Sequence, residues 1–164
     1  MRRTLVSPLY SLSGSAPPEE RWRFVYRPGE KLMDTYFLPE RLPAWLIEKD
    51  VQVFAQEFQR TGFRGGLNWY RNIDRNWGST PFLAGAKLGQ PTLFIAGEAD
   101  PVLKMYRKPV DSLERNVPNL KGKFILPGSG HWVNQERPGE VNQLLLPFLK
   151  SFSPHPSSST PEIA

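Results

Sequence analysis

The chain has 164 residues, 39% hydrophobic and 23% charged, which are values typical of one globular domain. It has no cysteine and only two histidines, which excludes disulfides and thiolate metal sites, so we expect no metal and no other cofactor. The formal charge of +5 is spread along a sequence without a long apolar run or a signal peptide, so we expect a cytoplasmic protein with neither a nucleic-acid nor a membrane partner.

The first half of the sequence predicts helices connected by irregular segments. Residues 13–43 are rich in proline and glycine, which disfavour regular structure, but their aromatic residues suggest that the segment packs on a neighbour. Asp50 is predicted to cap a helix whose apolar residues lie three and four positions apart. Gly62 is predicted to end that helix.

A second helix is predicted for residues 66–77, with aromatic residues on both of its faces. A helix of this kind usually lies between two surfaces, as a lid does over a cavity. The neighbouring arginines also suit single-stranded nucleic acid, but no recognised nucleic-acid motif accompanies them.

The second half predicts a parallel α/β layer. Residues 91–97 and 123–126 are short apolar runs bounded by turn formers, and helices are expected at residues 109–117 and from Pro138 onward. Two strands offer few backbone pairings, so this layer calls for more sheet than the chain supplies. The polar, proline-rich tail 153–164 is predicted to be disordered, and its His155 to be inert.

Two residues with acid/base chemistry follow the two predicted strands. Asp100 comes just after the first strand and His131 just after the second. Loops at the carboxyl ends of neighbouring parallel strands open on the same sheet edge, where a carboxylate can orient an imidazole. The alternative is structural: Asp100 as a turn residue before Pro101, and His131 as a loop residue bonded to backbone.

Four strings of residues carry a resemblance to a known family. They are FRGGLNWYRNIDRNW at 63–77, GEADPV at 97–102, GHW at 130–132 and RPGEVN at 137–142. Their content and order resemble the soluble epoxide hydrolases of the α/β-hydrolase fold, and the similarity covers roughly residues 1–150.

The resemblance implies an incomplete α/β-hydrolase fold, with a helical cap or lid at residues 1–80 and the carboxy-terminal part of the core at residues 81–152. It also implies hydrolysis of a small apolar epoxide through a covalent ester. Tyr70 would donate a proton to the epoxide oxygen, and Asp100 would orient His131 to activate water. Trp69 and Trp132 would contact the substrate. The structural alternative for Tyr70 is a packed lid aromatic.

The sequence lacks two motifs of that family, and no residue of this chain is assigned as the nucleophile. Neither a His-Gly-x-Pro segment nor a Gly-x-Asp-x-Gly nucleophile elbow occurs in it. We therefore expect the chain alone to be inactive. Either Met1 lies inside the cap of a longer enzyme, or a separate amino-terminal chain supplies the missing part; exposed apolar faces could also cause self-association.

Two other functions compete with epoxide hydrolysis. Haloalkane dehalogenases use a similar Asp-His-acid arrangement, but a departing halide needs no proton, so Tyr70 argues against them. A noncatalytic binding module or subunit that keeps the lid and its apolar groove is the second alternative.

Overall fold

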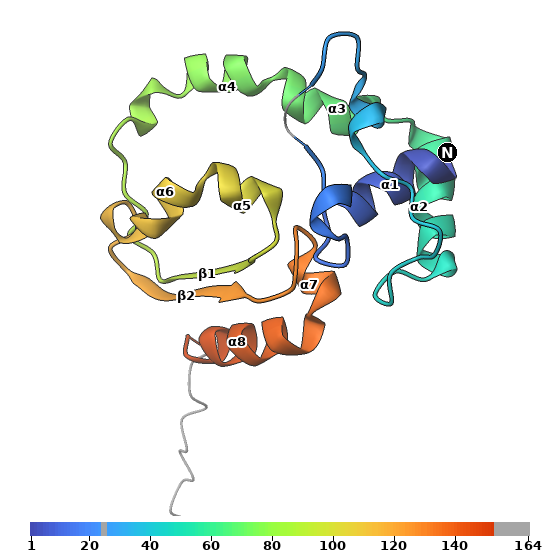
Figure 1. Ribbon diagram of the computed structural model, residues 1–164. Helices are drawn as coiled ribbons and strands as arrows, with labels where there is room; N and C mark the ends of the chain where they lie inside the picture. Colours follow the sequence, from blue (N-terminus) through green and yellow to red (C-terminus); the bar gives the residue numbers. More distant parts are fainter. Residues whose placement is uncertain (24–25, 153–164) are drawn as a thin grey trace, which may run out of the picture.

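The computed structural model describes residues 1–23 and 26–152, so the predicted tail with His155 lies outside the described residues. A helical first half is followed by two strands and further helices (Figure 1). The α-helices and strands are α1 (Arg2–Ser11), α2 (Glu48–Thr61), α3 (Arg64–Arg71), α4 (Ile73–Ser79), β1 (Thr92–Gly97), α5 (Pro101–Met105), α6 (Arg107–Asp111), β2 (Leu120–Leu126), α7 (Val133–Glu136) and α8 (Pro138–Lys150). In the described ranges, four short 3-10 helices connect them: η1 (Pro18–Glu20), η2 (Leu32–Thr35), η3 (Pro81–Leu83) and η4 (Leu113–Arg115).

Helices α1 and α2 pack side by side and form the apolar core of the first half (Figure 1). Val6 of α1 and Val51 of α2 are almost fully buried together with Leu46. The predicted cap of α2 was wrong by one turn. The helix begins at Glu48, and Asp50 lies inside the first turn, where its carboxylate accepts the Ile47 N–H at 3.3 Å. The predicted end at Gly62 is confirmed, with a φ of 67° that favours glycine.

The predicted single helix at residues 66–77 is two helices, α3 and α4, which meet at Asn72. The Asn72 side-chain amide donates to the Asn68 carbonyl at 2.7 Å, and the Asn72 backbone has a ψ of 5°. A side chain that bonds the preceding turn competes with the helical backbone ladder, which explains the break. The aromatic residues are also more exposed than predicted, since Trp69 and Trp77 are 79% and 84% exposed.

The two predicted strands are confirmed, and they pair in parallel as expected of the α/β class. Gly97 at the end of β1 is paired with Leu126 at the end of β2, so both strands finish at the same edge. Helices α5 and α6 lie on one side of the strands and α8 on the other (Figure 1). The side chains of β1 are only half-buried up to Ala96, because a sheet of two strands covers little of its own surface.

The predicted helix at residues 109–117 is present only as the end of α6 and the short η4. None of the helices in the described part of the chain is long and apolar enough to cross a membrane.

Candidate active site

Asp100 lies in the loop that leaves β1 and serves as the cap of α5. Its Oδ1 accepts the backbone N–H of Val102 at 2.8 Å, and Pro101 occupies the first helical position, where no N–H is needed. The Asp100 side chain is 14% exposed. This cap orients the carboxylate and leaves its second oxygen, Oδ2, free to bind a neighbour.

That neighbour is His131, which lies in the loop that leaves β2. The His131 Nδ1 is 3.2 Å from Asp100 Oδ2 and 3.3 Å from Oδ1. The hydrogen bond to Asp100 raises the pKa of His131 above its ordinary value, burial opposes this, and the negative charges of Asp100 and Glu136 support it. Among the described residues no partner bonds the His131 Nε2, so that nitrogen is available to a water molecule or substrate.

The backbone of the His131 loop is held by contacts that the sequence analysis did not foresee. The His131 N–H donates to the Leu12 carbonyl at 2.8 Å, and the Ala99 N–H donates to the Ser129 carbonyl at 2.8 Å. A methyl group on Gly130 would lie 2.4 Å from the Leu12 carbonyl oxygen. The loop therefore sits between β1 and the segment that follows α1, with no room for a side chain at position 130.

Glu136 adds a second anchor, also missed by the sequence analysis. Its carboxylate accepts the backbone N–H groups of Gly14, Gly130 and Trp132 at 2.7 to 3.2 Å. The only sequence signal for it is a glutamate five positions after the histidine, and no helical or strand periodicity distinguishes that glutamate from its neighbours.

Trp132 lies beside the pair and is partly buried. Its ring meets the His131 ring edge to face, with centroids 4.8 Å apart, and its indole N–H donates to the Leu9 carbonyl at 2.9 Å. These contacts hold the indole against α1 and place it beside the imidazole.

Tyr70 and Trp69 lie on α3 and line a large, mainly apolar cavity of about 940 Å³. The cavity is bounded by residues from α1, η2, α2, α3 and α4 and from the positions next to them: Thr4, Pro8, Leu32, Met33, Tyr36, Phe58, Phe63, Gly66, Leu67, Trp69, Tyr70 and Ile73. Tyr70 itself is 73% exposed. Burial, with smaller effects of Tyr26 and Tyr70, raises the pKa of Tyr36 to about 12, so the Tyr36 phenol in this cavity is protonated near neutral pH.

The five predicted site residues form two groups. Asp100, His131 and Trp132 meet at the edge of the sheet, while Tyr70 and Trp69 lie on the helical half. Within residues 1–23 and 26–152, no hydrogen bond, ion pair or ring contact joins the two groups.

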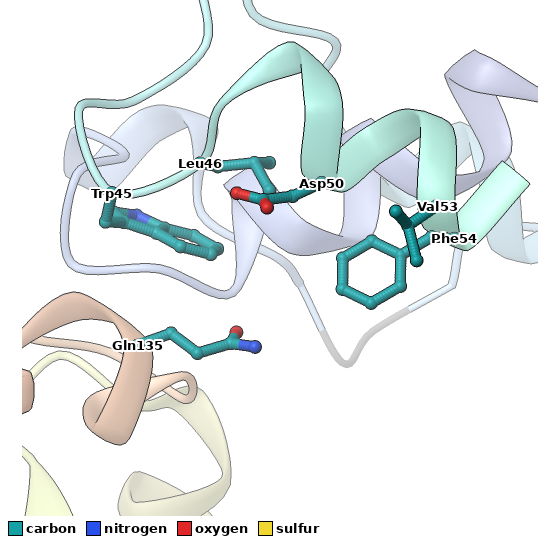
Figure 2. Close-up of a pocket in the computed structure, with 6 residues that line it drawn as sticks. All are labelled: Trp45, Leu46, Asp50, Val53, Phe54 and Gln135. Atoms are coloured by element: carbon teal, nitrogen blue, oxygen red, sulfur yellow. The ribbon is translucent and has the colours of Figure 1, made fainter.

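A smaller cavity of about 370 Å³ marks the seam between the α2 region and α7 (Figure 2). Trp45, Asp50 and Phe54 face Gln135 of α7 across it. None of the predicted site residues lines this cavity, but Gln135 directly precedes Glu136. The part of the chain that the structure describes holds no group of three or more histidine, aspartate or glutamate side chains suited to a metal ion.

Comparison with known proteins gives consistent relatives, although no family model matches the chain. Epoxide hydrolase A of Mycobacterium tuberculosis is 43% identical over 141 residues, which are 84% of this chain and 43% of that protein. Epoxide hydrolase 1 of Siraitia grosvenorii is 40% identical over 119 residues, which are 70% of this chain and 38% of that protein.

Solved structures agree with the sequence comparison. An epoxide hydrolase from an endophytic Streptomyces superposes with a TM-score of 0.83 at 41% identity, covering 91% of this chain and 46% of that one. Epoxide hydrolase A of Mycobacterium thermoresistibile gives a TM-score of 0.80 at 41% identity, with the same two coverages. The chain thus spans less than half the length of the relatives that it matches.

Proposed function

The chain is homologous to epoxide hydrolases of the α/β-hydrolase fold, and from this premise we propose that it takes part in the hydrolysis of an epoxide to a vicinal diol through a covalent ester. In this proposal, residues 1–80 act as a helical lid and residues 81–152 contribute to the catalytic core. The single observation that supports it most directly is the 3.2 Å contact between His131 and Asp100 at the shared end of the two strands.

In the proposed mechanism, the Asp100–His131 pair activates the water that cleaves the ester. Neutral His131 takes a proton from water at Nε2, and the Nδ1–H remains bonded to Asp100, whose charge stabilises the imidazolium that forms. The hydroxide then adds to the ester carbonyl carbon, the acyl C–O bond breaks, and the His131 imidazolium returns its proton to the departing oxygen, which releases the diol. The freed carboxylic acid loses its proton to solvent and the Tyr70 phenolate regains one, so every group returns to its starting state. Trp132 excludes water from one side of the imidazole in this proposal.

Tyr70 serves the first step, in which the epoxide ring opens. The carboxylate nucleophile forms the ester bond at one ring carbon, and the C–O bond of that carbon breaks. The phenol donates a proton to the epoxide oxygen, which stays on the neighbouring carbon and does not have to carry the full charge of an alkoxide. The apolar cavity around Tyr70 suits an apolar epoxide of moderate size, which Trp69 would contact. Because Tyr70 has no contact with His131 within the described residues, ring opening and ester hydrolysis use two separate groups of residues.

The nucleophile of the first step is not assigned to any residue of this chain. The sequence contains no Gly-x-Asp-x-Gly elbow, so we propose that the purified chain does not turn over epoxides and needs a segment that carries the elbow.

Complementation tests this proposal. The chain is mixed or coexpressed with the amino-terminal half of a homologous epoxide hydrolase, and diol formation from an apolar epoxide is measured, with His131→Ala as the control. Turnover that depends on both parts and on His131 is the expected result. Diol formation by the purified chain alone, abolished by His131→Ala, would overturn the inactivity of the isolated chain.

One observation favours a second function, namely the large aromatic cavity beside Tyr70. A noncatalytic binding module would use this cavity without the Asp100–His131 pair. Binding of an apolar epoxide to the chain, with no turnover in any complemented assembly, would favour the binding module over the enzyme.

A further inference from the structure

Four backbone hydrogen bonds hold the peptide groups around His131. The N–H of Gly130, which precedes the histidine, donates to both oxygens of the Glu136 carboxylate at 3.1 Å. The N–H of Trp132, which follows it, donates to Oε1 at 3.2 Å. The N–H of His131 itself donates to the Leu12 carbonyl at 2.8 Å. Glu136 therefore binds the backbone on both sides of the histidine.

The same carboxylate reaches a distant segment of the chain. Its Oε2 accepts the Gly14 N–H at 2.7 Å, although the two residues are 122 positions apart in the sequence. Gly14 and Gly130 pack so closely that a methyl group on Gly130 would lie 2.5 Å from the Gly14 nitrogen. One carboxylate thus joins the segment after α1 to the loop that carries His131.

We propose that Glu136 is a positioning residue for His131, which fixes the place of the imidazole by holding the backbone on both sides of it against residues 12–14. This inference rests on the proposed function, since it assigns Glu136 a part in presenting the water-activating histidine. Within the described residues Glu136 forms no ion pair, and its carboxylate accepts hydrogen bonds from backbone N–H groups.

A carboxylate is chemically suited to this position and an amide is not. Both oxygens of Glu136 accept: Oε1 serves Trp132, Oε2 serves Gly14, and both serve Gly130. In glutamine, one of these oxygens becomes an NH₂ group that would face an N–H donor. Glu136→Gln therefore removes an anchor as well as a charge, with little change in side-chain volume.

The charge of Glu136 also acts on His131 directly. Together with the hydrogen bond and the charge of Asp100, it favours the protonated imidazole and raises the pKa of His131. The His131 titration therefore reports the nearby charge of Glu136, whereas amide exchange at Gly130 and Trp132 reports whether Glu136 holds the backbone on both sides of the histidine.

The test uses the purified full chain and NMR, with no need for turnover. Glu136→Gln is expected to lower the pKa of His131 and to accelerate amide exchange at Gly14, Gly130 or Trp132 by about tenfold or more, the effect of losing a hydrogen bond to a charged acceptor. Glu140→Gln is the matched control, since it removes the same charge from an exposed side chain four residues along the chain. It is expected to change neither quantity.

Equal amide exchange at Gly130 and Trp132 in Glu136→Gln and Glu140→Gln would overturn the proposal, whatever the His131 titration shows. If Glu136→Gln fails to fold, amide exchange in the wild-type chain still decides: unprotected amides at both Gly130 and Trp132 would overturn the proposal, and protected ones would support it.

In a complemented assembly, Glu136→Gln is expected to lower kcat with little change in KM. A wild-type assembly without turnover counts against the proposed function, whereas the NMR result decides the role of Glu136 independently.

Discussion

The Nδ1 of His131 lies 3.2 Å from the Oδ2 of Asp100, although the two residues are 31 positions apart in the sequence. The contact exists because β1 and β2 pair in parallel and end together at Gly97 and Leu126. Each loop then needs only a few residues to bring its side chain to the same edge of the sheet.

Asp100→Asn tests whether the carboxylate controls the imidazole. The amide oxygen can still cap α5 by accepting the Val102 N–H, so we expect the fold to be kept. The pKa of His131 should fall, because its largest favourable cause is the hydrogen bond to Asp100. NMR titration of the imidazole measures this, with Asp111→Asn at the exposed ion pair with Arg107 as the control. An unchanged His131 titration would contradict the assigned contact.

The pH dependence of the unfolding free energy should also report the pairing of His131 with Asp100. The folded-state pKa of His131 is raised above 6.5, so the stabilisation from its pair with Asp100 is fully present below the unfolded value and is lost as the pH rises through the folded value. The effect should be small, since the His131 side chain is partly exposed. Urea unfolding of wild type and His131→Ala at pH 5.5 and pH 8.5 should show a larger difference in unfolding free energy at the lower pH. A larger difference at pH 8.5 would reverse the sign and refute the pairing.

Tyr70→Phe should lower the rate of diol formation without lowering the stability of the fold. The Tyr70 side chain is largely exposed, so removing its hydroxyl should leave the thermal unfolding midpoint nearly unchanged. In a complemented assembly, diol formation should fall about 10²- to 10⁴-fold, the usual contribution of a general acid. The matched control is Tyr106→Phe, an exposed tyrosine that does not line the cavity. Full activity of Tyr70→Phe would exclude the phenol as the proton donor.

Gly130→Ala should destabilise the chain. Its methyl group would lie 2.4 Å from the Leu12 carbonyl oxygen and 2.5 Å from the Gly14 nitrogen, both of which are backbone atoms that cannot move aside cheaply. We expect a loss of about 1 to 3 kcal/mol in unfolding free energy, measured by urea denaturation. In the control Gly139→Ala the methyl group would meet nothing within 4 Å, so stability should stay equal or rise slightly. Equal stabilities of the two variants would show that the loop is not packed as described.

The exposed aromatic residues of α4 and η3 should promote self-association of the isolated chain. Trp77 and Phe82 are 84% and 77% exposed and lie five residues apart. Replacing both with serine should lower the average mass measured by sedimentation at high concentration. Met105→Gln, at another exposed apolar residue, is the control and should change it little. A wild-type chain that stays monomeric at high concentration would refute this prediction.

Much of the local structure follows from sequence patterns that the chain carries by itself. Short apolar runs bounded by turn formers predicted both strands, because a buried strand needs no polar face. The parallel order also predicted that Asp100 and His131 follow strands ending at one edge, which the structure shows as a 3.2 Å contact. The strings around Tyr70, Asp100 and His131 pointed to the epoxide hydrolases, and the comparisons confirm that relationship.

Other features depend on contacts that no local pattern contains. The periodicity at residues 66–77 did not show that the Asn72 side chain would bond the preceding turn and divide the helix. In the sequence, nothing distinguishes Glu136 from an ordinary surface glutamate. Its contacts depend on N–H groups of Gly14, Gly130 and Trp132 that only folding brings together. The sequence alone determined which residues are candidates for chemistry, because that choice depends on residue type and order. Tertiary structure decided what holds these residues in place. Every residue except proline carries the same backbone N–H donor, and only folding decides which acceptor each donor meets.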